Sequence, residues 1–392
     1  MTTTINNEHK KLNVPNLRFP EFQGEWEKHE LGGICEIITD FVAAGSFASL
    51  RENVKYYQED NYAQLVRTVD LKKDFTNNDF VYVDEFAYDF LWRVQLKEPN
   101  IVLPNIGANI GEKYYVSPKD LPKEKNVLGP NAILLRSKCN DTHFVFFRLS
   151  TSSYDNEMKK LVGASGQPKF NKTDLKKVRL FIPSLKEQKK ISYFLGLLEE
   201  RIAAQNKIID RLQSLIKGIA QKIVRNNMPN VRLTECLECK SSTLQESEVC
   251  EQGTYPVYGA NGIVGYLDNY NTESEAVYII KDGSGVGTVS YVTGKCSATG
   301  TLNTLQAKEG YSLHYLYYLL KVFNFEPYKT GMAIPHIYFK DYGKAKVFCP
   351  SYTEQLQYAR LLSAIDNKLS IEQNILTELS LQKQCLLRQM FI

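Results

Sequence analysis

Two stretches of this chain repeat each other closely enough to fix its organisation. Residues 168–212 align without a gap on residues 335–379, at a constant offset of 167 positions, which is 335 minus 168. The identical pairs include Pro168/Pro335, Asp174/Asp341, Lys177/Lys344, Phe181/Phe348, Glu187/Glu354, Gln188/Gln355, Leu195/Leu362, Ile208/Ile375 and Leu212/Leu379. Both copies continue into a segment with helical spacing of apolar residues. The chain therefore carries one unit twice, which predicts a pseudo-two-fold molecule suited to a two-part target.

Each repeat contains the start signal of a helix. A proline precedes a serine, and a glutamate follows three residues after the serine, which is the pattern of a capping box. The residues are Pro183, Ser184 and Glu187 in the first copy and Pro350, Ser351 and Glu354 in the second. We therefore expect long helices over 184–226 and 351–392.

Both predicted helices carry a narrow apolar seam with alternating steps of four and three residues, which is typical of coiled coils. The first seam is Ile191, Leu195, Leu198, Ile202, Gln205, Ile209, Leu212, Ile216, Ile219 and Ile223. The second is Tyr358, Leu362, Ile365, Leu369, Glu372, Leu376, Leu379, Lys383, Leu386 and Met390. A helix of about 40 residues is roughly 60 Å long, and one narrow seam needs a partner. We expect the two helices to pair as an antiparallel coiled coil.

Two polar residues interrupt the seams at equivalent positions, Gln205 in the first helix and Glu372 in the second. If the helices pair antiparallel, these positions meet near the middle. We hypothesise that the two side chains face each other and set the helix register, as isolated polar seam residues can. The alternative is that both are solvated residues at the rim of the seam.

The segments before the two helices read as mixed globules. Short runs rich in Val, Ile, Tyr and Phe alternate with Gly, Pro, Asn and Asp turns, which favours an α+β fold on a twisted sheet. The glycine-containing segment 105–116 matches 281–292, so the duplication includes the globules. We expect a polar tail over 1–13, a first globule over 14–183, its helix over 184–226, a second globule over 227–350 and its helix over 351–392.

Composition limits the class of protein. The 392 residues are 43% hydrophobic and 23% charged, which is ordinary for a folded protein of two or three domains. No apolar run reaches the roughly 18 residues that cross a bilayer, and no signal peptide opens the chain, so we expect a cytoplasmic protein. Cys236 and Cys239 form a lone CxxC without a second ligand pair, so we expect no structural metal.

Charge is concentrated at the junction of the first globule and its helix. Residues 159–190 hold ten Lys and Arg residues against only two acids, Asp174 and Glu187, a local balance of +8 (10 − 2), whereas the whole chain carries +4. Such a cluster is an electrostatic footprint for phosphates. The alternatives are a solvated surface or a contact for an acidic partner protein.

The sequence lacks the motifs of catalysis that we tested. The segment GSGVG at 283–287 is followed by a strand-like run rather than a helix, so it predicts a glycine-rich turn and not a nucleotide loop. The Asn-Pro-Pro-aromatic signature of an amino-methyltransferase is missing, and the five histidines show no metal spacing. We therefore expect a non-catalytic protein.

The chain resembles the DNA specificity subunits of type I restriction–modification enzymes. The resemblance lies in residues 15–37, beginning PNLRFPEFQGEWE, and in residues 162–191, which are echoed at 330–359. Its most specific part is the Pro-x-x-x-Glu-Gln element at 183–188 and 350–355. The second globule departs from the pattern because it lacks the Arg-Phe-Pro…Trp-Glu opening of 18–27. It also has Met332-Ala333-Ile334 where the first repeat is more polar.

The resemblance implies two target-recognition domains that read the halves of a bipartite, asymmetric site in double-stranded DNA. The helices would hold the domains apart and dock two methyltransferase subunits, and restriction or motor subunits would join the complex. The cofactors S-adenosylmethionine, ATP and Mg²⁺ would then belong to partner chains. Two rival readings are a methyltransferase with a built-in recognition region and a non-catalytic coiled-coil adaptor without DNA specificity.

Loop placement and side-chain chemistry suggest which residues contact DNA, since amides, hydroxyls and cations read base edges or phosphates. The candidates in the first globule are Asn105, Asn109, Lys113, Gln167, Lys169 and Lys172. The candidates in the second are Lys281, Ser284, Lys295, Thr330 and His336.

Overall fold

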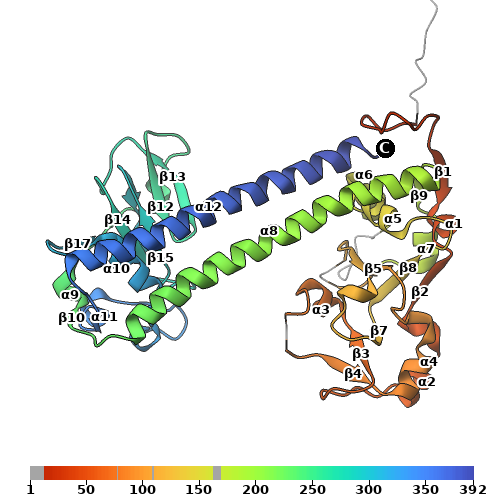
Figure 1. The fold of residues 1–392 in the computed structure, drawn as a ribbon, viewed down its shortest axis with the longest axis horizontal. Coiled ribbons are helices and arrows are strands. Elements are labelled where there is room, and N and C mark those ends of the chain that lie inside the picture. Colours follow the sequence, from red (N-terminus) through yellow and green to blue (C-terminus); the bar gives the residue numbers. More distant parts are fainter. Residues whose placement is uncertain (1–12, 77, 108–109, 162–168) are drawn as a thin grey trace, which may run out of the picture. The chain divides into compact units, whose positions relative to one another are not determined.

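The computed structural model describes residues 13–76, 78–107, 110–161 and 169–392. These residues form two compact units. Unit 1 contains residues up to Ile202 together with Glu378–Ile392, and unit 2 contains Ala203–Thr377. Both units are drawn in Figure 1, coloured along the sequence.

Unit 1 is built on a four-stranded antiparallel sheet with the order β2-β8-β5-β6, beside a three-stranded sheet with the order β4-β3-β7. The strands are β1 (Glu27–Glu30), β2 (Ile37–Asp40), β3 (Ala63–Val66), β4 (Val81–Val83), β5 (Asn100–Pro104), β6 (Tyr114–Val116), β7 (Asn126–Leu128), β8 (Ala132–Arg136) and β9 (Arg179–Ile182). The helices are α1 (Leu31–Ile34), α2 (Phe47–Asn53), α3 (Thr68–Lys72), α4 (Glu85–Phe90), α5 (Thr142–Leu149), α6 (Ser152–Leu161), α7 (Lys172–Lys176) and the start of α8 (Leu185–Arg225). Short 3₁₀ turns are η1 (Phe41–Ala44), η2 (Trp92–Val94) and η3 (Pro118–Asp120).

Unit 2 repeats this plan with fewer helices. Its four-stranded sheet has the order β11-β17-β14-β15 and its three-stranded sheet the order β13-β12-β16. The strands are β10 (Val231–Arg232), β11 (Leu237–Ser241), β12 (Tyr255–Gly259), β13 (Gly262–Leu267), β14 (Ala276–Ile280), β15 (Val289–Val292), β16 (Ser297–Ala298), β17 (Leu302–Ala307) and β18 (Lys346–Val347). The other elements are α9 (Leu233–Cys236), η4 (Glu246–Glu248), α10 (Leu313–Lys321), η5 (Glu326–Tyr328), α11 (Phe339–Tyr342) and α12 (Tyr352–Gln389).

The two units share one strand plan, and the α+β fold predicted from the sequence is confirmed. Adding nine to a strand number in unit 1 gives its counterpart in unit 2, in every sheet and every pairing. The parallel pair β3–β7 has its counterpart in the parallel pair β12–β16. The small sheet β1–β9, which joins the start of the globule to its end, has its counterpart in β10–β18. The duplication therefore extends through the globules, where sequence similarity is weak.

The long helices pair with each other inside each unit. In unit 1, Ile191 and Leu195 of α8 share a core with Met390 and Phe391 of α12. In the same unit Glu199 accepts a bond from Lys383 at 2.5 Å. Residue numbers along α12 therefore decrease where those along α8 increase, so the two helices run antiparallel. This is the antiparallel pairing that the seams predict. In unit 2, Ile209, Ile216 and Ile223 of α8 lie in one core with Leu362 and Leu369 of α12.

The sheet-packing helix of each unit is the aromatic segment between the last sheet strand and the long helix. In unit 1, Phe144 and Phe147 of α5 are fully buried against the sheet and the first turns of α8. In unit 2, Tyr315 and Tyr318 of α10 occupy the corresponding core. Within the described ranges, no helix combines the length and the apolar character needed to cross a membrane.

Candidate nucleic-acid interface

The same edge of the four-stranded sheet carries a polar, glycine-containing loop in both units, after β5 in unit 1 and after β14 in unit 2. In unit 1 the loop after β5 begins at Asn105, whose N–H donates to Asn131 O (3.2 Å) and whose O accepts from Phe170 N–H (3.3 Å). In unit 2 the loop after β14 begins at Lys281, which makes the same two bonds with Thr301 and Ile337, at 3.0 and 2.9 Å. We call these surfaces the loop edge of each unit.

One further backbone bridge closes each loop edge at the equivalent place. Ile106 pairs with Lys169 in unit 1, and Asp282 pairs with His336 in unit 2. The two loop edges therefore share one backbone frame. The side chains on that frame differ, because an isoleucine and a lysine in unit 1 stand where unit 2 has an aspartate and a histidine.

The loop edge of unit 1 brings Asn105, Lys169 and Lys172 together. The Asn105 side chain is half-buried, and its Nδ2 lies 3.5 Å from Phe170 O. Lys172 donates to Asp40 Oδ1 at 2.8 Å, so its charge is already paired. Lys169 is exposed, and its ammonium has no partner among the residues that the structure describes. Asn109 and Gln167 lie outside the described residues.

Lys113 lies away from solvent in a structural contact. Its Nζ donates to Asp155 Oδ1 at 2.7 Å and to Gly111 O at 3.1 Å, and its side chain is only 13% exposed. A lysine held in this way ties α6 to the loop before β6. Lys113 is therefore less available to a phosphate than the free cation that the sequence suggested. The ion pair could not be predicted locally, because Asp155 is distant in sequence.

The loop edge of unit 2 brings Lys281, Ser284, Thr330 and His336 together. Ser284 is exposed in the glycine turn, while Lys281 is half-buried. His336 Nδ1 lies 2.6 Å from Asp282 Oδ1, and Thr330 and His336 exchange backbone bonds of 2.9 and 2.7 Å.

Lys295 is placed apart from these residues, in the turn before β16. Its ammonium lies 4.7 Å from the centre of the Tyr270 ring. The hydrogen bond with Tyr270 raises the pKa of Lys295. An exposed cation beside an exposed aromatic ring is a combination that suits a nucleotide.

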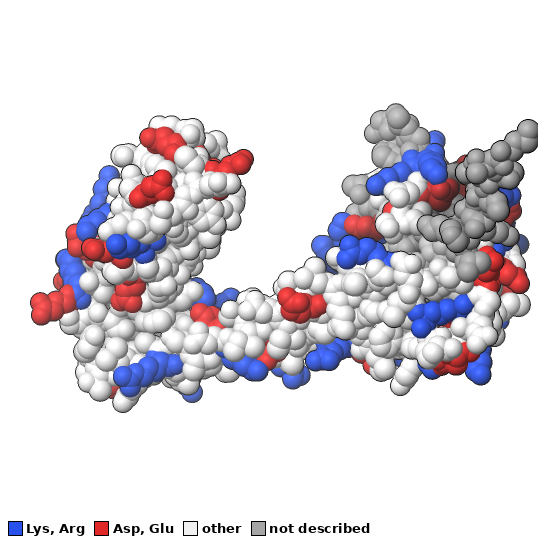
Figure 2. All heavy atoms as spheres, turned by 90° about the horizontal axis from the view of Figure 1, so that it is seen from above, with Lys and Arg blue, Asp and Glu red and all other residues white. Residues whose placement is uncertain are grey.

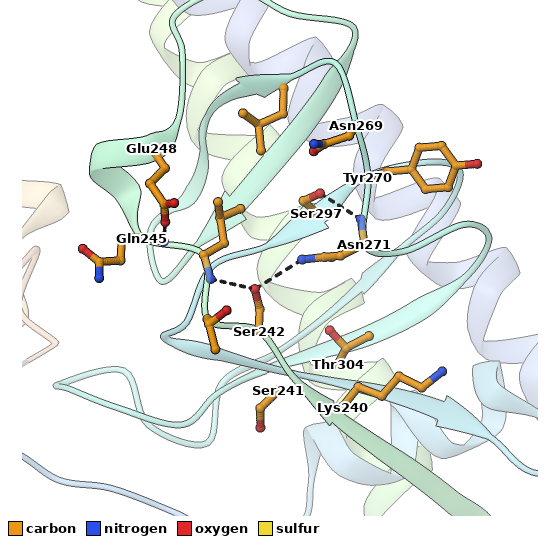
Figure 3. Close-up of a pocket in the computed structure, with 13 residues that line it drawn as sticks. Lys240, Ser241, Ser242, Gln245, Glu248, Asn269, Tyr270, Asn271, Ser297 and Thr304 are labelled. Carbon is orange, nitrogen blue, oxygen red and sulfur yellow. Dashed lines mark hydrogen bonds between the residues drawn. The ribbon is translucent and has the colours of Figure 1, made fainter.

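A polar groove adjoins the loop edge of unit 2, and sequence reasoning missed it (Figure 3). It is lined by Lys240, Ser241, Ser242, Thr243, Leu244, Gln245, Glu248, Leu267, Asn269, Tyr270, Asn271, Ser297 and Thr304. Gly300 N–H donates to Leu244 O at 2.7 Å and so joins the groove to the loop edge. Hydroxyls, amides and one lysine make this surface rich in both donors and acceptors.

Asn271 of the groove is held by bonds within the protein, whereas Gln245 and Asn269 expose their side chains to a ligand. Asn271 Nδ2 donates to Ser242 Oγ (3.3 Å) and to Ala298 O (3.1 Å), and its Oδ1 accepts from Ala298 N–H (3.0 Å). Gln245 and Asn269 are exposed in the same groove. The groove was missed because its walls, at 240–248 and 267–271, are close only after β11, β13 and β16 have paired with their neighbours.

The basic cluster at 159–190 is partly balanced by ion pairs with acids, four of which lie outside the cluster. Half of its ten cations are in ion pairs. The pairs are Lys160–Glu157, Lys172–Asp40, Lys177–Asp174, Arg179–Glu30 and Lys190–Glu21. Figure 2 shows Lys and Arg interspersed with Asp and Glu on the face that it presents. The local balance of +8 therefore overstates the charge available to phosphates.

The Pro-x-x-x-Glu-Gln element joins each globule to its long helix through the glutamine. Gln188 Nε2 donates to Pro183 O (2.9 Å) and its Oε1 accepts from Asp141 N–H (3.0 Å), at the start of α5. Gln355 makes the corresponding bonds with Pro350 O (2.9 Å) and Ser312 N–H (2.9 Å), at the start of α10. Both glutamines are buried, so each fixes the helix against its own globule.

The glutamate of the element behaves differently in the two copies, and the predicted capping box is complete only in the second. Glu354 accepts from Ser351 N–H at 3.1 Å while its own N–H faces Ser351 Oγ at 3.4 Å. In the first copy the N–H of Glu187 faces Ser184 Oγ at 3.5 Å, but the carboxylate turns away. It accepts two bonds of 2.8 Å from Arg18, which outcompetes a neutral backbone donor.

The two polar seam residues contact each other. Gln205 and Glu372 are 7% and 6% exposed, and Gln205 Nε2 donates to Glu372 O at 3.0 Å and to its carboxylate. Lys368 pairs with the same carboxylate, which lowers the pKa of Glu372. The pair is thus buried in the seam rather than solvated at its rim. That it sets the register stays a prediction.

Comparison with known proteins identifies the class. A family model described as the type I restriction modification DNA specificity domain matches residues 23–214 and 226–381, one match for each globule with most of its helix. The chain belongs to this family.

Relatives and a solved structure agree with the match. The putative type I restriction enzyme MjaX specificity subunit of Methanocaldococcus jannaschii is 23% identical over 410 aligned positions, covering 93% of this chain and 92% of that protein. The EcoprrI specificity subunit of Escherichia coli is 27% identical over 130 residues, and this match spans only 31% of that protein. The crystal structure of a type I restriction–modification S subunit from M. genitalium covers 97% of this chain with a TM-score of 0.65 and 17% identity, which shows the shared fold.

Proposed function

We propose that this chain is the sequence-reading subunit of a type I restriction–modification complex. Unit 1 reads one half of a bipartite, asymmetric site in double-stranded DNA, and unit 2 reads the other half. The chain itself is non-catalytic. Two methyltransferase subunits and the restriction or motor subunits bind to it, and they hold S-adenosylmethionine, ATP and Mg²⁺.

The observation that carries this proposal is the pair of loop edges. One backbone frame occurs twice, closed by equivalent bridges at Ile106–Lys169 and Asp282–His336. A protein that reads two different half-sites needs one scaffold with two sets of side chains, because base contacts specify the sequence while the scaffold only positions them. A coiled-coil adaptor without DNA specificity would have no use for two such polar loop edges.

The chemistry of the loop edges and of the polar groove suits base edges. Amides such as Gln245 and Asn269 can donate and accept at once, as adenine requires in the major groove. Hydroxyls of Ser284 and Thr330 can bond to bases or phosphates. Lys169 and Lys295 are exposed cations for phosphate contacts, and the Lys295 ammonium lies against the Tyr270 ring.

A patch on the first turns of α8 suits the docking of a methyltransferase subunit. Tyr193, Phe194 and Leu197 are 70%, 39% and 47% exposed, side by side on one helix face. Phe19 packs edge-on against Phe194 with ring centres 5.9 Å apart, which holds the ring in place. Clustered exposed aromatics are typical of protein interfaces. Changing Tyr193 and Leu197 to serine should weaken co-purification of the methyltransferase subunit.

Methylome sequencing tests the proposal. A host would express the methyltransferase subunit with and without this chain, and modified adenines would be mapped. The proposal predicts methylation in a split motif with a fixed gap, present only when the chain is present. If the complex assembles and yet no chain-dependent methylation is found, the adaptor reading replaces it.

A further inference from the structure

The loop at 330–336 presents apolar side chains to solvent inside the polar loop edge of unit 2. Met332 is 106% exposed and Ile334 is 57% exposed, so neither contributes to the core. The loop lies against the glycine turn of Ser284, where Gly283 N–H donates to Pro335 O at 3.0 Å. Met332 therefore contributes almost nothing to the core of unit 2, and its side chain is accessible to a binding partner.

The base of this loop is fixed. Thr330 and His336 exchange two backbone bonds of 2.9 and 2.7 Å, and the His336 ring is held by Asp282. Gly331 has φ +89°, a conformation that L side chains rarely adopt, and an added Cβ would lie 2.3 Å from Ile334 O. The loop is therefore a tight hairpin whose tip is aimed by its base, and little conformational entropy is lost when the tip enters a partner.

The surroundings favour DNA over a protein partner. A protein-binding patch has an apolar centre wider than one loop tip. Here Met332 and Ile334 lie in a loop whose base is bonded to the polar segment 281–284, through Gly283 N–H to Pro335 O and Ile337 N–H to Lys281 O. Proteins that deform a duplex use this arrangement, in which an apolar wedge enters a base step while polar groups around it bind base edges and backbone.

We propose that Met332, supported by Ile334, is a wedge that enters a base step of the half-site read by unit 2 and unstacks it. This proposal rests on the proposed function. It makes the two half-sites unequal. The first repeat has Ser165, Gly166 and Gln167 at the matching sequence positions, which lie outside the described residues, and this polar sequence supplies no wedge. Unstacking should occur in one half-site only.

The test uses the complete complex with its methyltransferase subunits and a duplex carrying its methylated motif. The fluorescent base 2-aminopurine replaces one base at a time in each half-site, and its emission rises where stacking is lost. The wild-type complex should give a rise at one step of the unit 2 half-site in addition to any signal from the methylated adenine. Met332→Ser should remove that rise and lower affinity for the motif about tenfold, as expected for one lost buried apolar side chain.

Two variants serve as controls. Met332→Leu keeps the wedge apolar and should retain the rise. Met228→Ser removes another methionine of unit 2 that is 85% exposed, and it should change neither emission nor affinity. An unchanged emission profile and affinity in Met332→Ser would overturn the wedge. So would a loss of methyltransferase binding in Met332→Ser with the profile unchanged, since this assigns the loop to a protein contact.

The failure of the wedge is distinct from the failure of the proposed function. If the wild-type complex binds and methylates a split motif but shows no Met332-dependent emission, only the wedge is wrong. If the wild-type complex recognises no motif, the proposed function fails and the wedge fails with it.

Discussion

In both units the Pro-x-x-x-Glu-Gln element anchors a long helix to its globule. The glutamine makes the same contacts in the two copies, whereas the glutamate makes different ones. Gln188 and Gln355 make matching buried bonds to the helix that covers the sheet. Glu187 is 1% exposed and binds Arg18 and Trp26, whereas Glu354 is exposed and caps only its own helix. The difference follows from the opening segment of unit 1, which unit 2 lacks. An identical residue pair in a repeat therefore need not have an identical role.

The largest difference should appear when the glutamates are removed. Glu187→Ala leaves the Arg18 guanidinium, whose side chain is 15% exposed, without its counter-charge. Removing one partner of a buried pair typically costs about 3 kcal/mol. Glu354→Ala removes only an exposed capping contact and should cost about 0.5–1 kcal/mol. Urea unfolding of both variants, followed by hydrogen exchange in each unit, measures this, and equal losses would contradict the assigned roles.

The glutamines should behave alike. Gln188→Ala and Gln355→Ala each remove two bonds to the backbone, one of them buried and one half-buried, for an expected loss of about 2 kcal/mol. Hydrogen exchange should locate the loosening at α5 in the first variant and at α10 in the second. If only one of the two variants is destabilised, the glutamine contact is not the common anchor.

We expect Gln205 and Glu372 to lower the free energy of unfolding while they fix the register of α8 against α12. Changing both Gln205 and Glu372 to leucine should raise the free energy of unfolding by about 1 kcal/mol, because apolar replacements of buried polar pairs are often stabilising. Zero-length carbodiimide cross-linking of Glu199 to Lys383 reports the native register. We expect additional, shifted cross-links in the double variant. A loss of stability with the cross-link pattern unchanged would count against a register role.

Acid should loosen unit 2 before unit 1. Burial lowers the pKa of His314, which stacks on Tyr291 with ring centres 4.2 Å apart. Its neutral form is favoured in the folded state, so the stability that it contributes is complete above its ordinary pKa of about 6.5 and is lost as the pH falls below that value. Burial alone would raise the pKa of Glu199, but bonds from His143 and Lys383 lower it, so its contribution is lost only below about 4.5.

Hydrogen exchange of α10 and α5 between pH 7.5 and 5.5 measures this order. Exchange in α10 should quicken over this range, and His314→Gln should remove the effect. An equal change in α5, or a pH dependence that persists in His314→Gln, would contradict the account.

The smallest expected effect is a difference in the salt dependence of DNA binding between variants of two lysines in the loop edge of unit 1. Lys169→Ala should weaken DNA binding by the complex and reduce the slope of log affinity against log salt by about 1, since it removes one phosphate contact. Lys172→Ala should change the slope less, because Lys172 is paired with Asp40. A larger change for Lys172 than for Lys169 would show that the ion pair opens on DNA.

The sequence predicts this fold where its patterns are long. The seams and their polar interruptions predicted two long helices, their antiparallel pairing and the contact between Gln205 and Glu372. Short patterns predicted less, since β7 and helices α2, α3 and α4 were not anticipated. Elements of three to seven residues give too little periodicity to be identified.

The candidate interface was harder to predict, because loop side chains are positioned by partners far away in sequence. Lys113 and Lys172 looked like free cations until the fold brought Asp155 and Asp40 to them. The polar groove contains Gln245 and Asn269, which no local pattern places together. What the repeat did predict correctly is the frame, since Asn105 and Lys281 occupy equivalent backbone positions.

The central claim is that each unit reads its own half-site. A chimera in which residues 231–347 are replaced by the equivalent residues 29–180 tests it most directly, by methylome sequencing of a host that also expresses the methyltransferase subunit. The account predicts a new split motif in which the half-site of unit 1 occurs twice. An assembled, active chimera that still methylates the original asymmetric motif would contradict it.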